Sequence, residues 1–155
     1  MKKYIKKSLL GLLIFLILIQ FIRIDTDNPK VDLGKDFIAL TSPTEEVKTV
    51  LNNACYDCHS NTTTYPWYSQ IAPVSWWLKH HVDEGRSELN FSEWGDYSAK
   101  KADHKLEECA EEVEEGKMPL NPYTWTHGDA KLSAEQRKAL AEFFENLRGE
   151  STETE

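Results

Sequence analysis

The sequence lacks any stretch in which apolar and polar residues alternate with a period of two, and it contains no internal repeat. The first absence argues against half-buried strands, and the second excludes a repeat architecture. Apolar residues recur instead at spacings of three and four, which is the pattern of one buried helix face. The 155 residues suffice for one small domain and a short extra segment. We therefore predict an all-α fold.

Acidic residues are absent from positions 1–24, which hold five of the 18 basic residues and the apolar run Leu9–Ile19. A basic start followed by an apolar run is typical of a secretion signal or a signal anchor. No pair of small residues follows the run to suit a signal peptidase, and no nearby cysteine offers a site for lipid attachment. We therefore expect a membrane anchor at 1–24, although the run is short of about 20 residues, with a cleaved signal as the alternative. The lysines before the run place everything after Arg23 outside the cytoplasm.

The rest of the chain is strongly acidic. Removing five basic residues from 18 leaves 13, against 26 acidic ones, so the formal charge after residue 24 is −13. Such a domain should repel nucleic acid and anionic membranes and would favour a basic partner.

Four helices are predicted after a polar tether. Residues 25–41 show no sustained periodicity and are expected to link the anchor to the domain, which covers 42–149. Ser42 can cap the first helix, with Pro43 and Glu45 in favourable positions behind it. The predicted helices, marked by capping residues or by terminal glycines, are 43–54, 75–83, 99–115 and 133–149. The acidic tail 150–155 is expected to be disordered.

Cysteine is scarce, with three residues in the chain, and an odd number does not suit a scaffold held only by disulfides. Cys55-Tyr56-Asp57-Cys58-His59 is the pentapeptide of c-type haem attachment. Two thiols three residues apart can each add to one vinyl group of a haem, and the next residue then brings its imidazole to the iron. The motif thus predicts one covalent haem c per chain, at Cys55 and Cys58, with His59 as an axial ligand.

Two other chemistries use the same residues. A thioredoxin-like redox pair would need a strand before Cys55, and none is predicted there. A zinc site would need a fourth ligand, which Cys109 or another histidine could supply. Cys109 lies on the apolar stripe of the helix 99–115, so a buried, inert thiol is expected.

Met118 is the predicted sixth ligand of the iron. It stands in Gly116-Lys117-Met118-Pro119, a loop long after His59, and the only other methionine is Met1. A thioether ligand raises the reduction potential relative to two imidazoles. His127, in the loop that follows, is its main rival. His80 and His81 are weaker rivals, and the remaining histidine, His104, is expected to be solvated.

The walls of the haem pocket are expected to be aromatic. The five tryptophans are Trp67, Trp76, Trp77, Trp94 and Trp125. An indole offers a flat apolar surface and a hydrogen-bond donor for a propionate, and Trp67 and Trp77 are the predicted haem contacts. The carbonyl of Pro66 or Pro73 is predicted to accept the second imidazole hydrogen of His59. Arg86 is the predicted propionate partner.

The chain resembles the family of small bacterial haem-binding domains related to cytochrome c. The resemblance covers roughly residues 42–148. The matching stretches are Cys55–His59, Tyr65–Tyr68, Ile71–Trp77, Gly85-Arg86, Leu89–Trp94, Met118-Pro119, Tyr123, His127 and Leu132-Ser133. It implies a cytochrome c-like, monohaem, all-helical domain that faces the periplasm.

These features predict a membrane-anchored periplasmic cytochrome that transfers single electrons to or from a redox partner with a basic docking surface. It would not be an enzyme, because two axial ligands leave no open position on the iron. A haem-based sensor with a displaceable sixth ligand is the alternative. Peroxidase activity would also need an open position, and the single attachment motif argues against the two-haem enzymes of that type.

Overall fold

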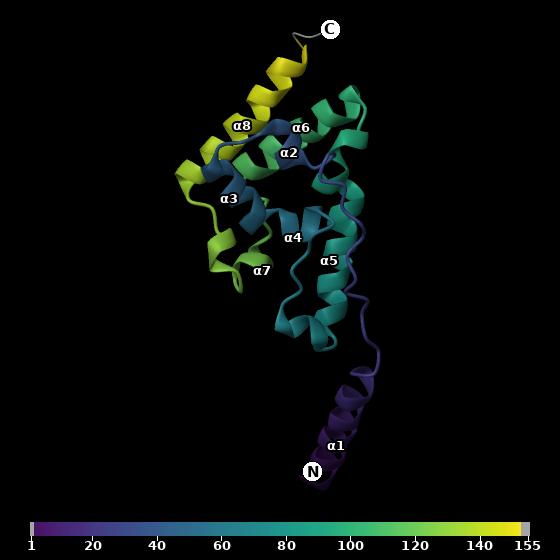
Figure 1. The fold of residues 1–155 in the computed structure, drawn as a ribbon. Helices are drawn as coiled ribbons and strands as arrows, with labels where there is room; N and C mark the ends of the chain where they lie inside the picture. Colours follow the sequence, from purple (N-terminus) through teal and green to yellow (C-terminus); the bar gives the residue numbers. More distant parts are fainter. Residues whose placement is uncertain (1, 153–155) are drawn as a thin grey trace.

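The computed structural model describes residues 2–152, which form helices and connecting loops without any strand (Figure 1). The all-α prediction is therefore confirmed over this range. The elements in chain order are α1 (Lys2–Ile19), α2 (Phe37–Thr41), α3 (Glu45–Ala54), α4 (Tyr56–His59), η1 (Trp67–Gln70), α5 (Val74–Glu88), η2 (Phe91–Asp96), α6 (Ala99–Glu114), α7 (Asn121–Thr124), η3 (Gly128–Ala130) and α8 (Ala134–Thr152). The three η elements are 3₁₀ turns.

The hydrophobic core lies between α3, α6 and α8, at the end of the molecule far from α1 (Figure 1). Its most deeply buried large side chains are Phe37, Leu51, Phe91, Leu140 and Phe144. Arg148 joins α8 to α6 through ion pairs with Asp103 and Glu107. The predicted apolar faces of these helices therefore meet one another, as their spacing requires.

Local capping signals set several helix ends. The Ser98 hydroxyl accepts a hydrogen bond from the Lys101 amide at the start of α6. Ser133 and Gln136 bond each other's backbone amides and so form a capping box at the start of α8. Ser42 was expected to cap the first helix of the domain, but Thr44 caps α3 instead. Ser42 ends α2, with φ +47°.

Two helices are longer than their glycines suggested. Helix α5 was expected to end near Gly85 but continues to Glu88, and α8 continues through Gly149 to Thr152. Part of the tail expected to be disordered is therefore helical, while residues 153–155 lie outside the described range. A glycine weakens a helix by only about 1 kcal/mol, so packing and neighbouring residues can carry the helix past it.

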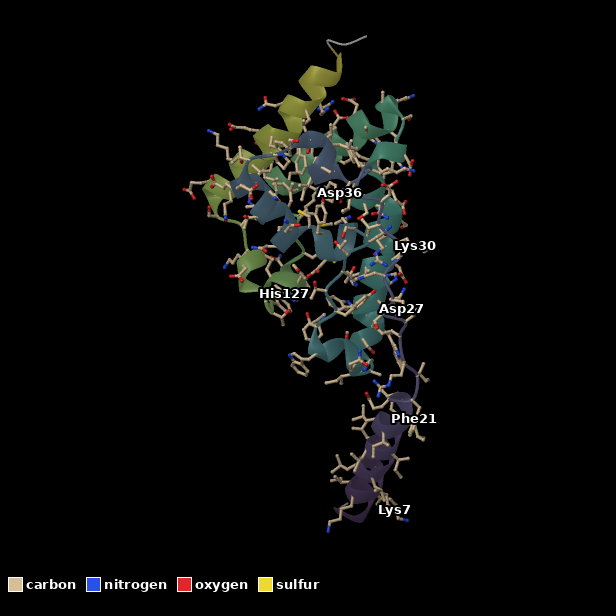
Figure 2. All side chains as sticks on the ribbon, in the orientation of Figure 1. Lys7, Phe21, Asp27, Lys30, Asp36 and His127 are labelled. Carbon is tan, nitrogen blue, oxygen red and sulfur yellow. The ribbon has the colours of Figure 1, made fainter. Side chains whose placement is uncertain are left out.

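The tether predicted for 25–41 is wrong for its second half. Phe37 in α2 is fully buried and its ring centroid lies 4.9 Å from that of Phe91. Asp36 caps α2 and accepts a hydrogen bond from the Tyr56 hydroxyl. Asn28, further back in the segment, bonds Thr63 O. Figure 2 labels Asp27, Lys30 and Asp36 along this stretch, which runs beside α5 to the core. The segment is thus part of the domain.

The N-terminal helix α1 projects from the opposite end of the molecule (Figure 1). Within residues 2–152, no helix is long and apolar enough to cross a membrane. The spanning anchor expected for 1–24 is therefore not supported. Helix α1 has 18 residues and four of them are lysines, Lys2, Lys3, Lys6 and Lys7.

Candidate functional site

Cys55 lies between α3 and α4, and the other four residues of the Cys55–His59 motif form the single turn of α4. The Cys55 carbonyl accepts hydrogen bonds from the amides of Cys58 (3.1 Å) and His59 (2.9 Å). The two thiols and the imidazole therefore project from a single turn of backbone. All three cysteines of the chain carry free thiols.

Residues inside and after the motif hold that turn in place. The Tyr123 hydroxyl donates to Asp57 Oδ2 at 2.8 Å and to Asn53 O at 3.2 Å. Just after the motif, the backbone N–H of Asn61 donates to the Ser92 hydroxyl. The side chain of Asn90 donates through Nδ2 to Asn61 Oδ1 at 2.9 Å. These last side chains are buried, so their hydrogen bonds are screened little by water. Hydrogen bonds therefore hold the chain at Asp57, within the motif, and at Asn61, just after it.

His59 is oriented by two backbone carbonyls. Its Nδ1–H donates to Gly85 O at 3.0 Å and to Leu89 O at 3.2 Å, at the end of α5. Burial lowers the pKa of His59 below its usual value, which favours the neutral ring. A neutral imidazole that donates through Nδ1 keeps the lone pair of Nε2 for a metal. The expected acceptor was Pro66 O or Pro73 O, and this was wrong because α5 passes closer to the ring.

Gly85 is required by that close passage. A Cβ at this position would lie 2.8 Å from Cys58 O and 3.2 Å from Cys58 Cβ, far inside normal contact. The glycine therefore lets α5 lie directly against the attachment turn and deliver its carbonyl to His59. The sequence predicted that Gly85 ends the helix. In the structure the helix continues, and the glycine is needed because α5 packs closely against Cys58.

Two cavities adjoin the motif. The first, here called the histidine–methionine cavity, has a volume of about 550 Å³ and is lined by Cys55, Cys58, His59 and Met118 together with apolar residues. The second, the aromatic cavity, has about 330 Å³. Cys58, His81, Leu120 and Tyr123 line both. The predicted attachment cysteines and the two predicted iron ligands thus share one cavity.

Met118 is held by its backbone. The amides of Lys117 and Met118 both donate to Glu112 O, at 2.9 and 3.0 Å, and Gly116 turns the chain with φ +74°. Arg137 from α8 donates to Val113 O and to Met118 O. The loop that presents the thioether is therefore fixed by hydrogen bonds to α6 and α8.

His127, the rival ligand, lies on the aromatic cavity and does not line the histidine–methionine cavity. Its Nδ1–H donates to Tyr123 O at 3.0 Å, and its ring stacks on Tyr123 with centroids 4.1 Å apart. Figure 2 labels His127 beyond α4, toward the end of the domain that carries α1. This geometry favours Met118 over His127 as a partner for His59 across one cavity.

The tryptophans do not line the histidine–methionine cavity. Trp67 and Trp77 line the aromatic cavity, Trp94 is buried in the core, and the Trp76 indole donates to Ile22 O. The apolar wall facing His59 and Met118 comes instead from Leu89, Phe91, Val113, Leu120 and Phe144. The predicted contacts of Trp67 and Trp77 with the haem stay a prediction, and both residues line the cavity next to Cys58.

Arg86, the predicted propionate partner, lines neither cavity. Its Nε donates to Ser60 O at 2.7 Å and its Nη2 to Asn28 Oδ1 and Thr63 Oγ1. It ties the chain on both sides of the motif together. In the described chain, Lys105 on α6 is the only lysine or arginine that lines the histidine–methionine cavity, and it pairs with Glu108 at 2.6 Å. Sequence reasoning missed Lys105, because nothing local distinguishes it from the other lysines of α6.

The cysteines face this cavity in their neutral form. Burial raises the pKa of Cys55 to about 12 and that of Cys58 to about 11. Burial also raises the pKa of Cys109, which lines the same cavity and is partly buried, not fully buried as expected. Protonated thiols are poor nucleophiles in disulfide exchange.

The two alternative chemistries find no support in the geometry. Across the part of the chain that the structure describes, no three His, Cys, Asp or Glu side chains are grouped so that they could hold a metal ion. The zinc site therefore lacks its ligand set. No strand precedes Cys55 within residues 2–152, as a thioredoxin-like motif would require.

The donor set and the cavity fit a haem. One imidazole with an available Nε2, one thioether and two thiols surround a mostly apolar space, within the range of about 300–1,000 Å³ that ligand pockets span. Fold and site together define the class of small helical proteins that enclose a metal-bearing macrocycle.

Comparison with known proteins agrees with this class. Residues 14–146 match the model of the haem-binding domain family, and the chain belongs to that family. No curated protein and no solved structure is significantly similar to the chain. The match begins at residue 14 and so includes the segment before Ser42 that packs onto the domain.

Proposed function

We propose that this haem protein is a c-type cytochrome that carries single electrons outside the cytoplasm. Cys55 and Cys58 would hold the haem covalently, and His59 and Met118 would bind its iron. The observation that carries the proposal is the orientation of His59: its Nδ1 is fixed by Gly85 O and Leu89 O, inside the cavity that both cysteines and Met118 line. When bound, the haem supplies an iron that can alternate between two oxidation states.

The protein's own residues suit rapid electron transfer. His59 and the Met118 loop are each held by two or more backbone hydrogen bonds, so the ligands need not move when the charge changes. This rigidity favours electron transfer over a sensor with a displaceable ligand. With both axial positions filled, no catalysis at the iron is proposed.

Residues 1–24 are proposed to direct export to the periplasm and to remain attached. Their order of charge and apolarity suits export. Gln20 and Ile22 bond residues of the domain, which supports retention over cleavage. Sequencing the N-terminus of the mature protein and fractionating cells would test this: a new N-terminus after residue 19 would show cleavage.

The partner is proposed to be a redox protein with a basic surface. Four glutamates, Glu84, Glu88, Glu108 and Glu112, line the histidine–methionine cavity. Opposite charge on a partner would steer association and weaken it at high salt.

The central test is spectroscopic. The full chain is expressed in a host that matures c-type haem, and its oxidised and reduced spectra are recorded with and without carbon monoxide. Three variants are compared: Met118→Ala, His127→Ala, and the double change of Cys55 and Cys58 to alanine. We expect a haem that stays on the denatured polypeptide, except in the double variant, and a sulfur–iron charge-transfer band that Met118→Ala abolishes.

The matched variant His127→Ala should keep that band. If His127→Ala abolished it instead, the assignment of the sixth ligand would be overturned. Carbon monoxide binding by the reduced wild type would favour the sensor, and a polypeptide without covalent haem would reject the cytochrome proposal.

A further inference from the structure

The end of the domain that carries α1 exposes large apolar side chains. Trp67 in η1 is 77% exposed, and Ile71, Val74 and Trp77 expose 43%, 44% and 45%. These four residues, here called the apolar face, come from one short stretch at η1 and the first turn of α5. A contiguous group of exposed large apolar residues marks an interaction surface more often than a single one does.

The residues that directly follow α1 are fastened to this same stretch. Gln20 makes two hydrogen bonds with the backbone of Ala72, both of 3.0 Å. Arg23 donates to Gln70 Oε1 at 2.8 Å, and the Trp76 indole donates to Ile22 O at 3.0 Å. Ile19 is buried at the junction. The helix is therefore joined to the apolar face through defined contacts and is not a free tail.

Helix α1 presents the same kind of surface. Every large apolar side chain from Leu9 to Leu18 exposes at least 40% of its surface, as do Phe21 and Ile22 beside the junction. Figure 2 shows these side chains extending from α1 on several sides, with Phe21 near the domain and Lys7 toward the far end. The exposed surface of α1 thus continues across Phe21 and Ile22 to the neighbourhood of Ile71 and Val74.

We propose that the apolar face rests on a lipid bilayer, so that the domain lies against the membrane surface and does not hang from it. Water does not favour so large an apolar surface, and lipid covers both α1 and the face at once. Two tryptophans at the edge of an apolar helix suit the membrane interface, where one side of the ring is apolar and the other is wet. Contact of this kind does not require α1 to span the bilayer.

The inference is independent of the haem. It concerns which side of the domain meets lipid, and it would hold for any function of the histidine–methionine cavity. It also places the aromatic cavity, whose walls include Trp67, Val74 and Trp77, next to the bilayer.

Oxidative footprinting of the full chain on phosphatidylcholine vesicles tests the proposal. Zwitterionic lipid is chosen because the acidic domain is repelled by anionic lipid. The rate of each tryptophan without vesicles is the control, and Trp125, which is 80% exposed at the end of α7, is the reference on vesicles. On vesicles we expect Trp67 to be oxidised roughly fivefold more slowly than Trp125, because interfacial lipid shields its ring.

The variant Ile71→Glu makes the test specific, since a charge on the face should lift it from lipid and Ile71 lines neither cavity. We expect Trp67 and Trp125 then to be oxidised at similar rates, while the visible spectrum stays unchanged. Equal oxidation of the two tryptophans in the wild type on vesicles would overturn the proposal. Slow oxidation of Trp67 without vesicles would assign the face to a second copy of the chain and would overturn it equally.

Discussion

The histidine–methionine cavity and the aromatic cavity share a wall at Cys58 and Tyr123 but differ in what surrounds them. The first is lined by α4, α5, α6 and the Met118 loop, and hydrogen bonds hold the His59 ring and the Met118 backbone. The second is bordered by η1 and the start of α5, where Trp67 and Trp77 remain exposed. The comparison separates the residues suited to bind iron from the aromatic ones that surround the motif.

The two cavities also differ in how far along the chain their lining residues lie from the Cys55–His59 motif. Residues that face His59 across one cavity, such as Met118 and Lys105, are far from it in the chain. Residues close after the motif, such as Trp67 and Trp77, line the other cavity. Proximity along the chain therefore does not tell which of the two cavities a residue lines.

The largest expected effect comes from Gly85→Ala, which would break the wall of the histidine–methionine cavity. The new Cβ would lie 2.8 Å from Cys58 O, so α5 must move away from the motif and from His59 Nδ1. We expect a loss of about 3 kcal/mol in the free energy of unfolding, since overpacking against backbone cannot relax easily. Thermal unfolding should show a Tm lower by roughly 10 °C.

Gly128→Ala is the matched control for that change. A Cβ at Gly128 meets no atom within 4 Å, so its effect should stay within about 0.5 kcal/mol. Similar losses for both variants would mean that glycine flexibility, and not the contact with Cys58, is what matters at Gly85.

Tyr123→Phe tests the wall that the two cavities share. It removes the hydroxyl that bonds Asp57 Oδ2 and Asn53 O, and leaves a charged acceptor without its partner. We expect a loss of about 1–2 kcal/mol, measured by denaturant unfolding. Tyr65→Phe is the control, because the buried Tyr65 hydroxyl has no hydrogen-bond partner within residues 2–152. If Tyr65→Phe cost as much, the bond to Asp57 would not be the cause.

The sequence predicted the helices well where local chemistry sets their ends. Ser98 and Ser133 cap helices as their spacing indicated, because a side-chain cap depends only on residues three or four positions apart. It failed at Gly85 and for the segment that contains Phe37. Both outcomes depend on tertiary packing, which overrides the local preference for a turn or a tether.

Some residues of the candidate site could likewise be predicted from local sequence, whereas others depend on tertiary packing. The Cys55–His59 motif could be found from its spacing, and Met118 from its loop and from the lack of any other methionine but Met1. Cys55, Cys58, His59 and Met118 all line one cavity. Arg86 was a reasonable propionate partner by chemistry, yet its guanidinium is engaged by Ser60, Asn28 and Thr63. Lys105 could be found only by folding the chain, because its position depends on how α6 meets α5.

Arg137→Gln should affect the histidine–methionine cavity alone. It removes the donor that bonds Val113 O and Met118 O, so the thioether should be held less firmly. We expect a weaker sulfur–iron charge-transfer band and some carbon monoxide binding in the reduced protein, with a stability loss of about 1 kcal/mol. Arg148→Gln is the control, since it lies on the same helix and pairs with Asp103, Glu107 and Glu145 far from Met118. An unchanged band in Arg137→Gln would show that the loop needs no support from α8.

The smallest effect is expected from Lys105→Gln, which removes a positive charge that only the histidine–methionine cavity contains. A nearby cation favours the reduced iron, so its loss should lower the midpoint potential. An interaction of about 1 kcal/mol corresponds to roughly 40 mV for one electron. Glu108→Gln, which removes its ion-pair partner, should shift the potential in the opposite direction.

Lys101→Gln is the matched control on α6, because Lys101 lies over the Tyr97 ring and lines neither cavity. Redox titration at fixed ionic strength separates these outcomes. Equal shifts for Lys105→Gln and Lys101→Gln would show that net charge acts on the iron, with no particular role for the lysine inside the cavity.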